Sequence, residues 1–161
     1  ISFETYVQQY YFKQVIAAAN KRLTVLTDGM FVLRVKEEAR NMRSQAGLDL
    51  DVLDRSTGLW RDVSTLSGGE SFMASLALAL GLADTVQSRS GGVRLDAMFI
   101  DEGFGTLDEN SLRQAMELLT RLAGGRRLVG VISHMAELKE RIDKKVVVTK
   151  TAAGSALRIE A

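Results

Sequence analysis

The first part of the chain carries apolar residues at helical spacing. Four of them recur at intervals of three and four positions, which places them on one helix face: Ile16, Ala19, Leu23 and Leu26. This pattern predicts an amphipathic helix from Ser2 to about Thr27. Asp28 and Gly29 follow at the position where a helix stop is expected.

The next segment alternates apolar and polar residues, which is the pattern of a strand with one buried face. The alternation runs over residues 31–36 and again over residues 48–52. It predicts two antiparallel strands that form a small β element. Polar residues 37–47, with Arg40 and Arg43, connect them. This connection is either a solvated loop or a contact for DNA phosphate.

Helix and strand patterns alternate in the second half of the chain. The predicted elements are a helix over residues 72–83, a strand over 95–101, a helix from Asp108 or Asn110 to about Ala123, a strand over 127–133, a short helix to about residue 142, and a closing hairpin of strands 145–149 and 156–159. Glycine-rich breaks at 90–92 and 124–125 separate them. Such alternation is typical of parallel strands with flanking helices, so the expected fold class is α/β.

Composition narrows the class of protein. A chain of 161 residues with 46% hydrophobic and 25% charged residues is expected to form one globular domain. Its 21 basic and 20 acidic residues leave a net charge of +1, so any DNA contact must use a local patch. The absence of cysteine excludes disulfides and thiolate metal sites and fits a cytoplasmic protein. The longest apolar run, residues 72–83, is short of the roughly 20 residues of a membrane span, so no membrane contact is expected.

Ser67-Gly68-Gly69-Glu70 marks the start of the central apolar helix. Thr65 or Ser67 is a natural N-cap, and Glu70 follows Ser67 at capping-box spacing. The first N–H groups of a helix lack intrahelical partners and attract anions, and two glycines would let a phosphate approach this backbone. Taken alone, the segment is better interpreted as a loop that runs into a capped helix. The other motifs of the chain favour the phosphate-binding interpretation instead.

The predicted strand 95–101 leads into two adjacent carboxylates, Asp101 and Glu102. On a buried parallel strand, this is the end where ligands bind. Neighbouring acids suit a divalent cation and a water that must lose a proton. His134 follows the next predicted strand. A lone histidine is more often structural, but its place beside the Asp-Glu strand favours donation to a phosphate.

These motifs together resemble those of ATP-binding-cassette (ABC) ATPases. Leu66–Glu70 resembles the signature motif, Met98–Glu102 the end of the Walker B strand, Gly105–Asp108 the D-loop, and Ser133-His134 the switch histidine. The longer sequences of residues 71–80, 99–108 and 130–134 are similar to those of the SbcC family. Its members are the ATPase subunits of bacterial nuclease complexes for DNA ends and hairpins. Four motifs in the correct order make the resemblance specific.

The resemblance implies that residues 1–161 form the C-terminal lobe of an ABC-type P-loop ATPase head. Residues 1–27 would continue from a coiled coil, and residues 66–161 would carry the motifs. In such a head Asp101 would hold Mg²⁺ through water, Glu102 would deprotonate the attacking water, and His134 would contact the γ-phosphate of ATP. The remaining candidate residues would face a second head. The nucleotide of that head would be contacted by Ser67, Gly68 and Gly69, and Asp108 would lie near the dimer interface.

The sequence contains no Gly-Lys dipeptide and therefore no phosphate loop of the Walker A type. In the family that the chain resembles, this loop lies in an N-terminal lobe. The resemblance therefore implies that half of the nucleotide site belongs to the N-terminal lobe of the same protein and that the isolated chain is inactive. The other implied partners are a second head in an ATP-dependent homodimer, an SbcD-like nuclease subunit and DNA.

Three alternatives remain. A transporter ATPase shares the four motifs, but it carries its phosphate loop in the same compact domain, for which this chain has no room. Another SMC-, RecF- or RecN-type ATPase also has a signature that ends in Glu. The sequence of residues 99–108, however, favours the SbcC family over these types. A scaffold that kept the fold and lost its chemistry would not need Asp101, Glu102 and His134.

Overall fold

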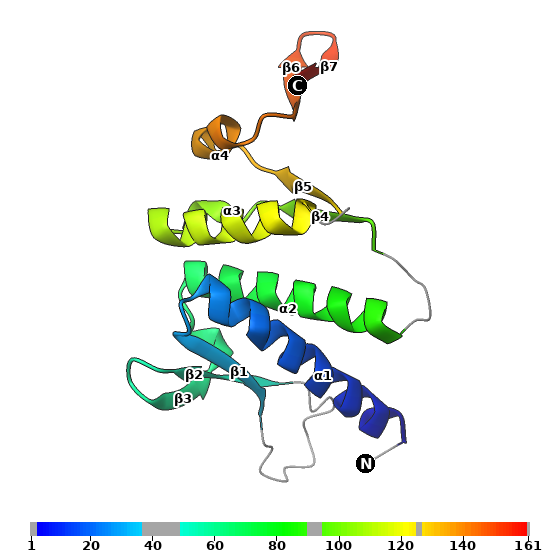
Figure 1. Ribbon diagram of the computed structural model, residues 1–161. Coiled ribbons are helices and arrows are strands. Elements are labelled where there is room, and N and C mark those ends of the chain that lie inside the picture. Colours follow the sequence, from blue (N-terminus) through cyan, green and yellow to red (C-terminus); the bar gives the residue numbers. More distant parts are fainter. Residues whose placement is uncertain (1–2, 37–48, 90–94, 125–126, 161) are drawn as a thin grey trace.

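The structure is a computed structural model that describes residues 3–36, 49–89, 95–124 and 127–160. In chain order the elements are α1 (Phe3–Leu26), β1 (Phe31–Val35), β2 (Leu50–Asp54), β3 (Leu59–Asp62), the 3₁₀ turn η1 (Val63–Thr65), α2 (Gly68–Arg89), β4 (Ala97–Asp101), the 3₁₀ turn η2 (Phe104–Thr106), α3 (Glu109–Ala123), β5 (Leu128–Ile132), α4 (Ala136–Arg141), β6 (Lys145–Thr151) and β7 (Gly154–Glu160). They are stacked along one direction: the β1–β3 sheet lies at one end, α1, α2 and α3 follow, and β4–β5, α4 and the β6–β7 hairpin continue to the other end (Figure 1).

The predicted N-terminal helix and the two predicted antiparallel strands are confirmed. β1 and β2 pair antiparallel with Leu33 opposite Val52, and both side chains are buried. The Asn20 side chain joins α1 to β1, because its amide donates to the Leu33 carbonyl and its carbonyl accepts from the Leu33 N–H, both at 2.8 Å. A third strand, β3, was not predicted, since four residues are too few to show an alternation. The connection with Arg40 and Arg43 lies outside the described residues.

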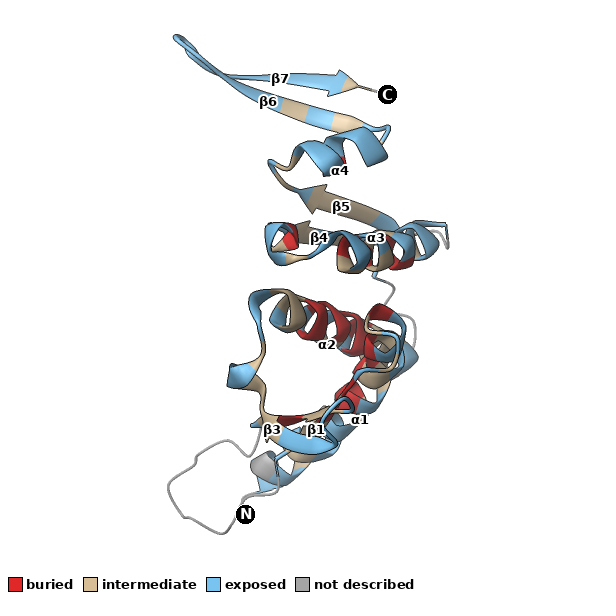
Figure 2. Cartoon of the chain, turned by 90° about the vertical axis from the view of Figure 1, so that its left-hand side faces the viewer, coloured by how far each residue is buried: buried red, intermediate tan, exposed pale blue. Residues whose placement is uncertain are grey.

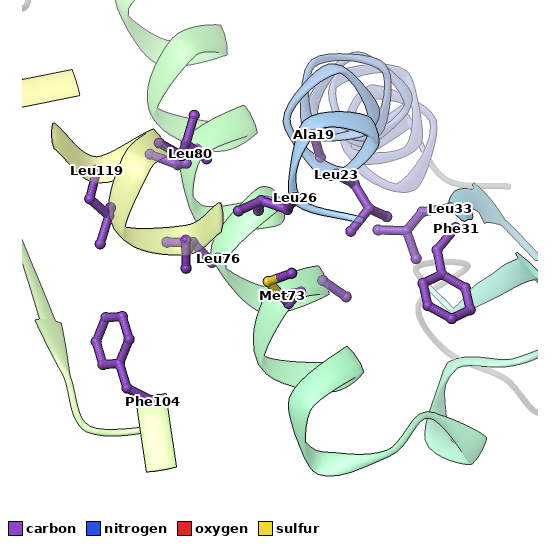
Figure 3. Close-up of a cluster of buried hydrophobic side chains, with 14 of the residues drawn as sticks. Ala19, Leu23, Leu26, Phe31, Leu33, Met73, Leu76, Leu80, Phe104 and Leu119 are labelled. Atoms are coloured by element: carbon purple, nitrogen blue, oxygen red, sulfur yellow. The ribbon is translucent and has the colours of Figure 1, made fainter. Parts of the chain in front are cut away.

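The main core lies between α1 and α2 and extends to the β1–β3 sheet on one side and to α3 on the other (Figure 3). The predicted face of α1 is the buried one: Ile16, Ala19, Leu23 and Leu26 are each at most 5% exposed. The two helices approach closely at Gly81, where a Cβ would lie 2.5 Å from the Ala19 nitrogen. Close packing of α1 against α2 therefore requires a glycine at this position.

β4 and β5 pair in parallel, as predicted, with Asp101 opposite Ile132. One face of this pair packs against the core through four partly buried residues: Met98, Ile100, Val129 and Val131. The opposite face is open, with Phe99 67% and Leu128 62% exposed. In the described part of the chain this strand pair is therefore buried on one face only, because no described element covers the second face.

The closing hairpin is confirmed, and its strands are longer than predicted. The register places Val146 opposite Ile159 and Val148 opposite Leu157, so these four apolar side chains share one face. Each of them is at least 60% exposed, and the hairpin is coloured almost entirely as exposed in Figure 2. The chain thus presents two apolar surfaces to solvent near its C-terminal end.

Candidate functional site

The C-terminal ends of β4 and β5 form the centre of the candidate site. The Glu102 N–H donates to the Ile132 carbonyl at 2.9 Å, which extends the parallel ladder one residue beyond β4. His134 lies two residues beyond β5, and its Nδ1 is 3.2 Å from the Glu102 Oε1. The side chains are 86% and 52% exposed, respectively. The structure therefore brings the predicted base and the predicted switch histidine together at an open edge.

Glu102 has an unusual backbone conformation. Its φ is +56°, a left-handed value that non-glycine residues rarely adopt, and the following Gly103 has a φ of +92°. Two consecutive left-handed residues turn the chain sharply from β4 into η2. For a non-glycine residue such as Glu102, this conformation costs about 1–3 kcal/mol and is concentrated at functional sites. The residue with this conformation is also the one whose carboxylate lies 3.2 Å from His134.

The start of α2 has the capping box that the sequence predicts. The Ser67 N–H donates to the Glu70 Oε2 at 2.8 Å, and the Glu70 N–H donates to the Ser67 Oγ at 3.3 Å. Ser67 and Gly68 are both exposed. The positive end of the α2 dipole therefore faces solvent at the residues that were expected to meet a phosphate.

The same end of α2 packs against the turn that follows β4. A Cβ at Gly69 would lie 2.8 Å from the Thr106 carbonyl oxygen, and a Cβ at Gly103 would overlap the Phe72 ring. Phe72 also packs against Phe104 with the two rings tilted, and their centroids are 4.8 Å apart. Gly69 was expected to leave room for an anion. The structure adds a second reason for a glycine, which is the contact of α2 with residues 103–106.

Asp108 caps α3, as predicted. Its Oδ1 accepts from the Ser111 N–H at 2.9 Å and its Oδ2 from the Ser111 hydroxyl at 3.1 Å. The hydrogen bonds from Ser111, the backbone one first, lower the pKa of the Asp108 carboxyl below its ordinary value. In this chain Asp108 therefore stabilises a helix start, and its place at a dimer interface stays a prediction.

The acidic pair fits a magnesium ion that is shared with a nucleotide. Asp101 and Glu102 are both exposed at the end of β4. Among the described residues, no group of three or more histidine or acidic side chains could hold a metal by itself. Mg²⁺ commonly uses one or two carboxylates and completes its shell with water and phosphate oxygens. The two carboxylates could therefore supply the protein's part of such a Mg²⁺ shell.

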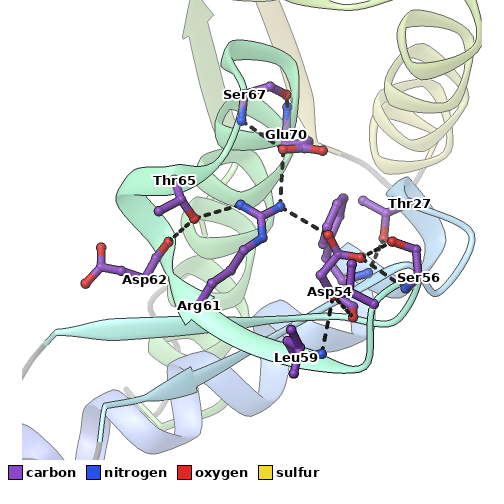
Figure 4. A network of polar contacts seen from close by, with 11 residues as sticks. Thr27, Asp54, Ser56, Leu59, Arg61, Asp62, Thr65, Ser67 and Glu70 are labelled. Atoms are coloured by element: carbon purple, nitrogen blue, oxygen red, sulfur yellow. Dashed lines mark hydrogen bonds and ion pairs between the residues drawn. The ribbon is translucent and has the colours of Figure 1, made fainter.

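Sequence reasoning missed the side chain that joins the β1–β3 sheet to the signature segment. Arg61, in β3, contacts Asp54, Thr65 and Glu70 (Figure 4). The segment between β2 and the signature gave no signal for it, because these contacts depend on how β3 turns into η1. The contacts of Gly69 and Phe72 with residues 103–106 were also missed, because they depend on how α2 packs against the turn after β4.

Comparisons with known proteins agree on the family. Residues 37–121, more than half of the chain, match the family described as SbcC/RAD50-like, Walker B motif. The chain is 49% identical over 159 residues to the SbcC subunit of nuclease SbcCD from Vibrio cholerae, and 48% identical over 155 residues to the same subunit from Treponema pallidum. These alignments cover 99% and 96% of the chain but only 16% and 15% of the relatives.

Solved structures show the same fold at low sequence identity. A structure from work on ATP-driven dimerisation and DNA-stimulated activation of SMC ATPases aligns with a TM-score of 0.70 at 15% identity, covering 98% of this chain and 89% of that one. The SMC head domain from Thermotoga maritima aligns with a TM-score of 0.58 at 18% identity, covering 98% and 52%. The expected fold class, an ABC-type ATPase head lobe, is confirmed. From the family match and the near-complete alignment with SbcCD subunits, the chain belongs to the SbcC/RAD50-like family.

Proposed function

We propose that this chain is the C-terminal lobe of the ATPase head in the SbcC subunit of an SbcCD-like nuclease. In this proposal ATP joins two heads, and its hydrolysis gates the cleavage of DNA ends or hairpins by an SbcD-like partner. The observation that carries the proposal is the contact between Glu102 and His134 at 3.2 Å across the ends of β4 and β5. It supports an intact catalytic edge in a chain whose relatives are named as nuclease subunits.

The proposed roles are those that the resemblance implies, and the positions of the side chains support them. Asp101 holds Mg²⁺ through water, and bound Mg²⁺ would neutralise charge that develops on the phosphate oxygens. Glu102 orients the attacking water and accepts its proton, which is the work of a general base. His134 contacts the γ-phosphate, and its hydrogen-bonding distance from Glu102 keeps the two groups on the same side of the site.

The signature segment is proposed to act on a different nucleotide. Ser67, Gly68 and Gly69 would face the ATP that a second head holds, and Asp108 would lie near the interface of the two heads. The exposed, capped start of α2 supports this assignment, because its N–H groups and dipole suit a phosphate that approaches from outside the chain.

The two exposed apolar surfaces support the presence of an N-terminal lobe. Parallel strands are normally covered on both faces, but the outer face of β4–β5 leaves Phe99 67% exposed. The hairpin face of Val146 and its neighbours is equally open. Contiguous apolar surface of this kind marks an interaction site. We infer that the N-terminal lobe of the same protein covers these faces and supplies the missing phosphate loop.

A second candidate is the ATPase head of another SMC-, RecF- or RecN-type protein. The likeness to SMC heads supports it, since those structures share the fold. Their sequence identity of 15% and 18% is far below the 49% found for the SbcCD subunit of Vibrio cholerae. The sequence comparison therefore favours the first candidate.

The substitution Glu102→Gln, made in the complete protein, tests the proposal. The amide cannot accept the proton, so single-turnover ATP hydrolysis should slow by about 10²- to 10⁴-fold, the usual contribution of a general base. ATP binding should persist, and the ATP-bound dimer should accumulate. Glu140→Gln, on an exposed position of α4, is the matched control. Unchanged hydrolysis in Glu102→Gln would contradict the assigned role.

A further inference from the structure

The Arg61 guanidinium lies where the β1–β3 sheet meets the start of α2. Nη1 donates to the Thr65 Oγ at 2.7 Å, and Nη2 donates to the Asp54 Oδ2 at 3.3 Å. Nη2 is also 3.6 Å from the Glu70 Oε2. The three partners belong to η1, β2 and α2, respectively. One side chain therefore connects three elements (Figure 4).

Two of these contacts are made with residues that precede and follow Ser67 in the sequence. Thr65 is the last residue of η1, directly before the signature, and its hydroxyl also donates to the Asp62 carbonyl at 2.6 Å. Glu70 lies in the first turn of α2, and the oxygen that approaches Arg61 is the one that accepts the Ser67 N–H. A displacement of Arg61 therefore removes one contact at each end of the segment that carries Ser67.

Asp54 provides the fixed end of this connection. Its side chain is 14% exposed, against 34% for Glu70. Hydrogen bonds from Ser56, with a smaller contribution from Arg61, lower the pKa of the Asp54 carboxyl below its ordinary value. Asp54 thus remains ionised at neutral pH and holds the guanidinium against β2, while Glu70 is the more exposed partner.

The importance of Arg61 lies in geometry more than in stability. Partly exposed ion pairs contribute little to folding. Helix N–H groups, however, act on a phosphate only at hydrogen-bond distance. A misplacement of about 1 Å in such a site can lower activity by about 10²-fold. A small rotation of Glu70 at the start of α2 would therefore weaken phosphate binding while changing the free energy of folding little.

We propose that Arg61 is a positioning residue that holds the signature segment in its binding geometry, through Glu70 on one side and Thr65 on the other. This inference rests on the proposed function, in which the signature segment contacts the nucleotide of a second head. Arg61 does not touch that nucleotide. It sets how much ATP is needed to join two heads, without affecting how each head binds ATP through its own phosphate loop.

The test uses the complete protein with the Glu102→Gln change, so that hydrolysis does not interfere. Arg61→Met is compared with Arg34→Met, because Arg34 also pairs with an aspartate of β2 but otherwise lies over the Trp60 ring in β3. Light scattering against ATP concentration measures dimerisation, and titration with a fluorescent ATP analogue measures nucleotide binding. Arg61→Met should raise the ATP concentration for half-maximal dimerisation at least tenfold and change nucleotide affinity less than twofold. Arg34→Met should change neither by more than twofold.

Two further measurements separate positioning from a general structural effect. In a Glu70→Gln background the neutral side chain still accepts the Ser67 N–H but no longer pairs with Arg61, so Arg61→Met should then change dimerisation less than threefold. An equal effect in both backgrounds overturns the inference. Hydrogen exchange without ATP should rise for residues 66–72 in Arg61→Met and stay unchanged in Arg34→Met. Because exchange does not depend on dimerisation, unchanged exchange overturns the role of Arg61 alone, whereas a parent protein that never dimerises with ATP overturns the proposed function.

Discussion

Gly81 offers a direct test of the packing between α1 and the signature helix α2. In Gly81→Ala the new Cβ would lie 2.5 Å from the Ala19 nitrogen, 2.7 Å from the Val15 carbonyl oxygen and 2.8 Å from the Ala19 Cα. Comfortable heavy-atom contacts lie near 3.5–4.0 Å, so the helices would have to separate by about 1 Å. All three atoms belong to the backbone of α1, and no rotamer change can relieve the contact.

Two opposing contributions set the magnitude. Alanine in a helix interior is favoured over glycine by about 1 kcal/mol. Overpacking typically costs about 1–3 kcal/mol, and the upper end applies here because the clash is with backbone on a buried face. The net loss in the free energy of unfolding should therefore be about 2 kcal/mol. For a chain of this size that corresponds to a fall of about 4–8 °C in Tm.

Urea unfolding of the 161-residue chain, followed by the fluorescence of its single tryptophan, Trp60, measures this loss. Gly124→Ala is the matched control, because a Cβ there would meet the Arg121 carbonyl oxygen at an ordinary 3.6 Å. That variant should be neutral or more stable by up to about 1 kcal/mol. If Gly81→Ala were as stable as Gly124→Ala, the close approach of α1 and α2 would not be a feature of the native protein.

Two further predictions concern the nucleotide. Ser67→Arg in the complete protein places a long side chain where the phosphate must approach the backbone, so ATP-dependent dimerisation and ATPase activity should be lost while ATP binding persists; loss of binding as well would mean that Ser67 acts on its own head's nucleotide. The isolated chain lacks the loop that surrounds the β- and γ-phosphates, so it should show neither ATPase activity nor calorimetric binding of Mg-ATP at micromolar concentrations. Micromolar binding by the chain alone would argue against a site divided between two lobes.

Local sequence patterns were sufficient for most of the fold. Residues 67–70 form the predicted capping box because its partners are three positions apart and meet in any helix that starts there. The approach of His134 to Glu102 followed from topology, since parallel neighbouring strands end at the same edge. The first feature depends on a spacing of three residues, and the second on the parallel pairing of two strands. Both can be read from the sequence.

Contacts between residues far apart in the sequence could not be predicted in this way. The left-handed φ of Glu102 could not be derived from a glutamate in sequence, and the contacts of Arg61 depend on the path of β3, which was itself missed. The pattern around Phe99 predicted burial without indicating what would bury it. In the described part of the chain that face is open, because periodicity identifies an apolar face but not the molecule that covers it.

The packing of α2 on the turn after β4 bears on how two nucleotides would influence one another. Phe72 fills the space over Gly103, and Gly69 rests on Thr106 without room for a methyl group. A tilt of α2 at the signature would therefore press on residues 103–106, which adjoin Glu102. In the proposed dimer, engagement of the second head's ATP would alter the geometry around the first. Such coupling within one chain would make hydrolysis depend on ATP concentration in a sigmoidal rather than a hyperbolic manner.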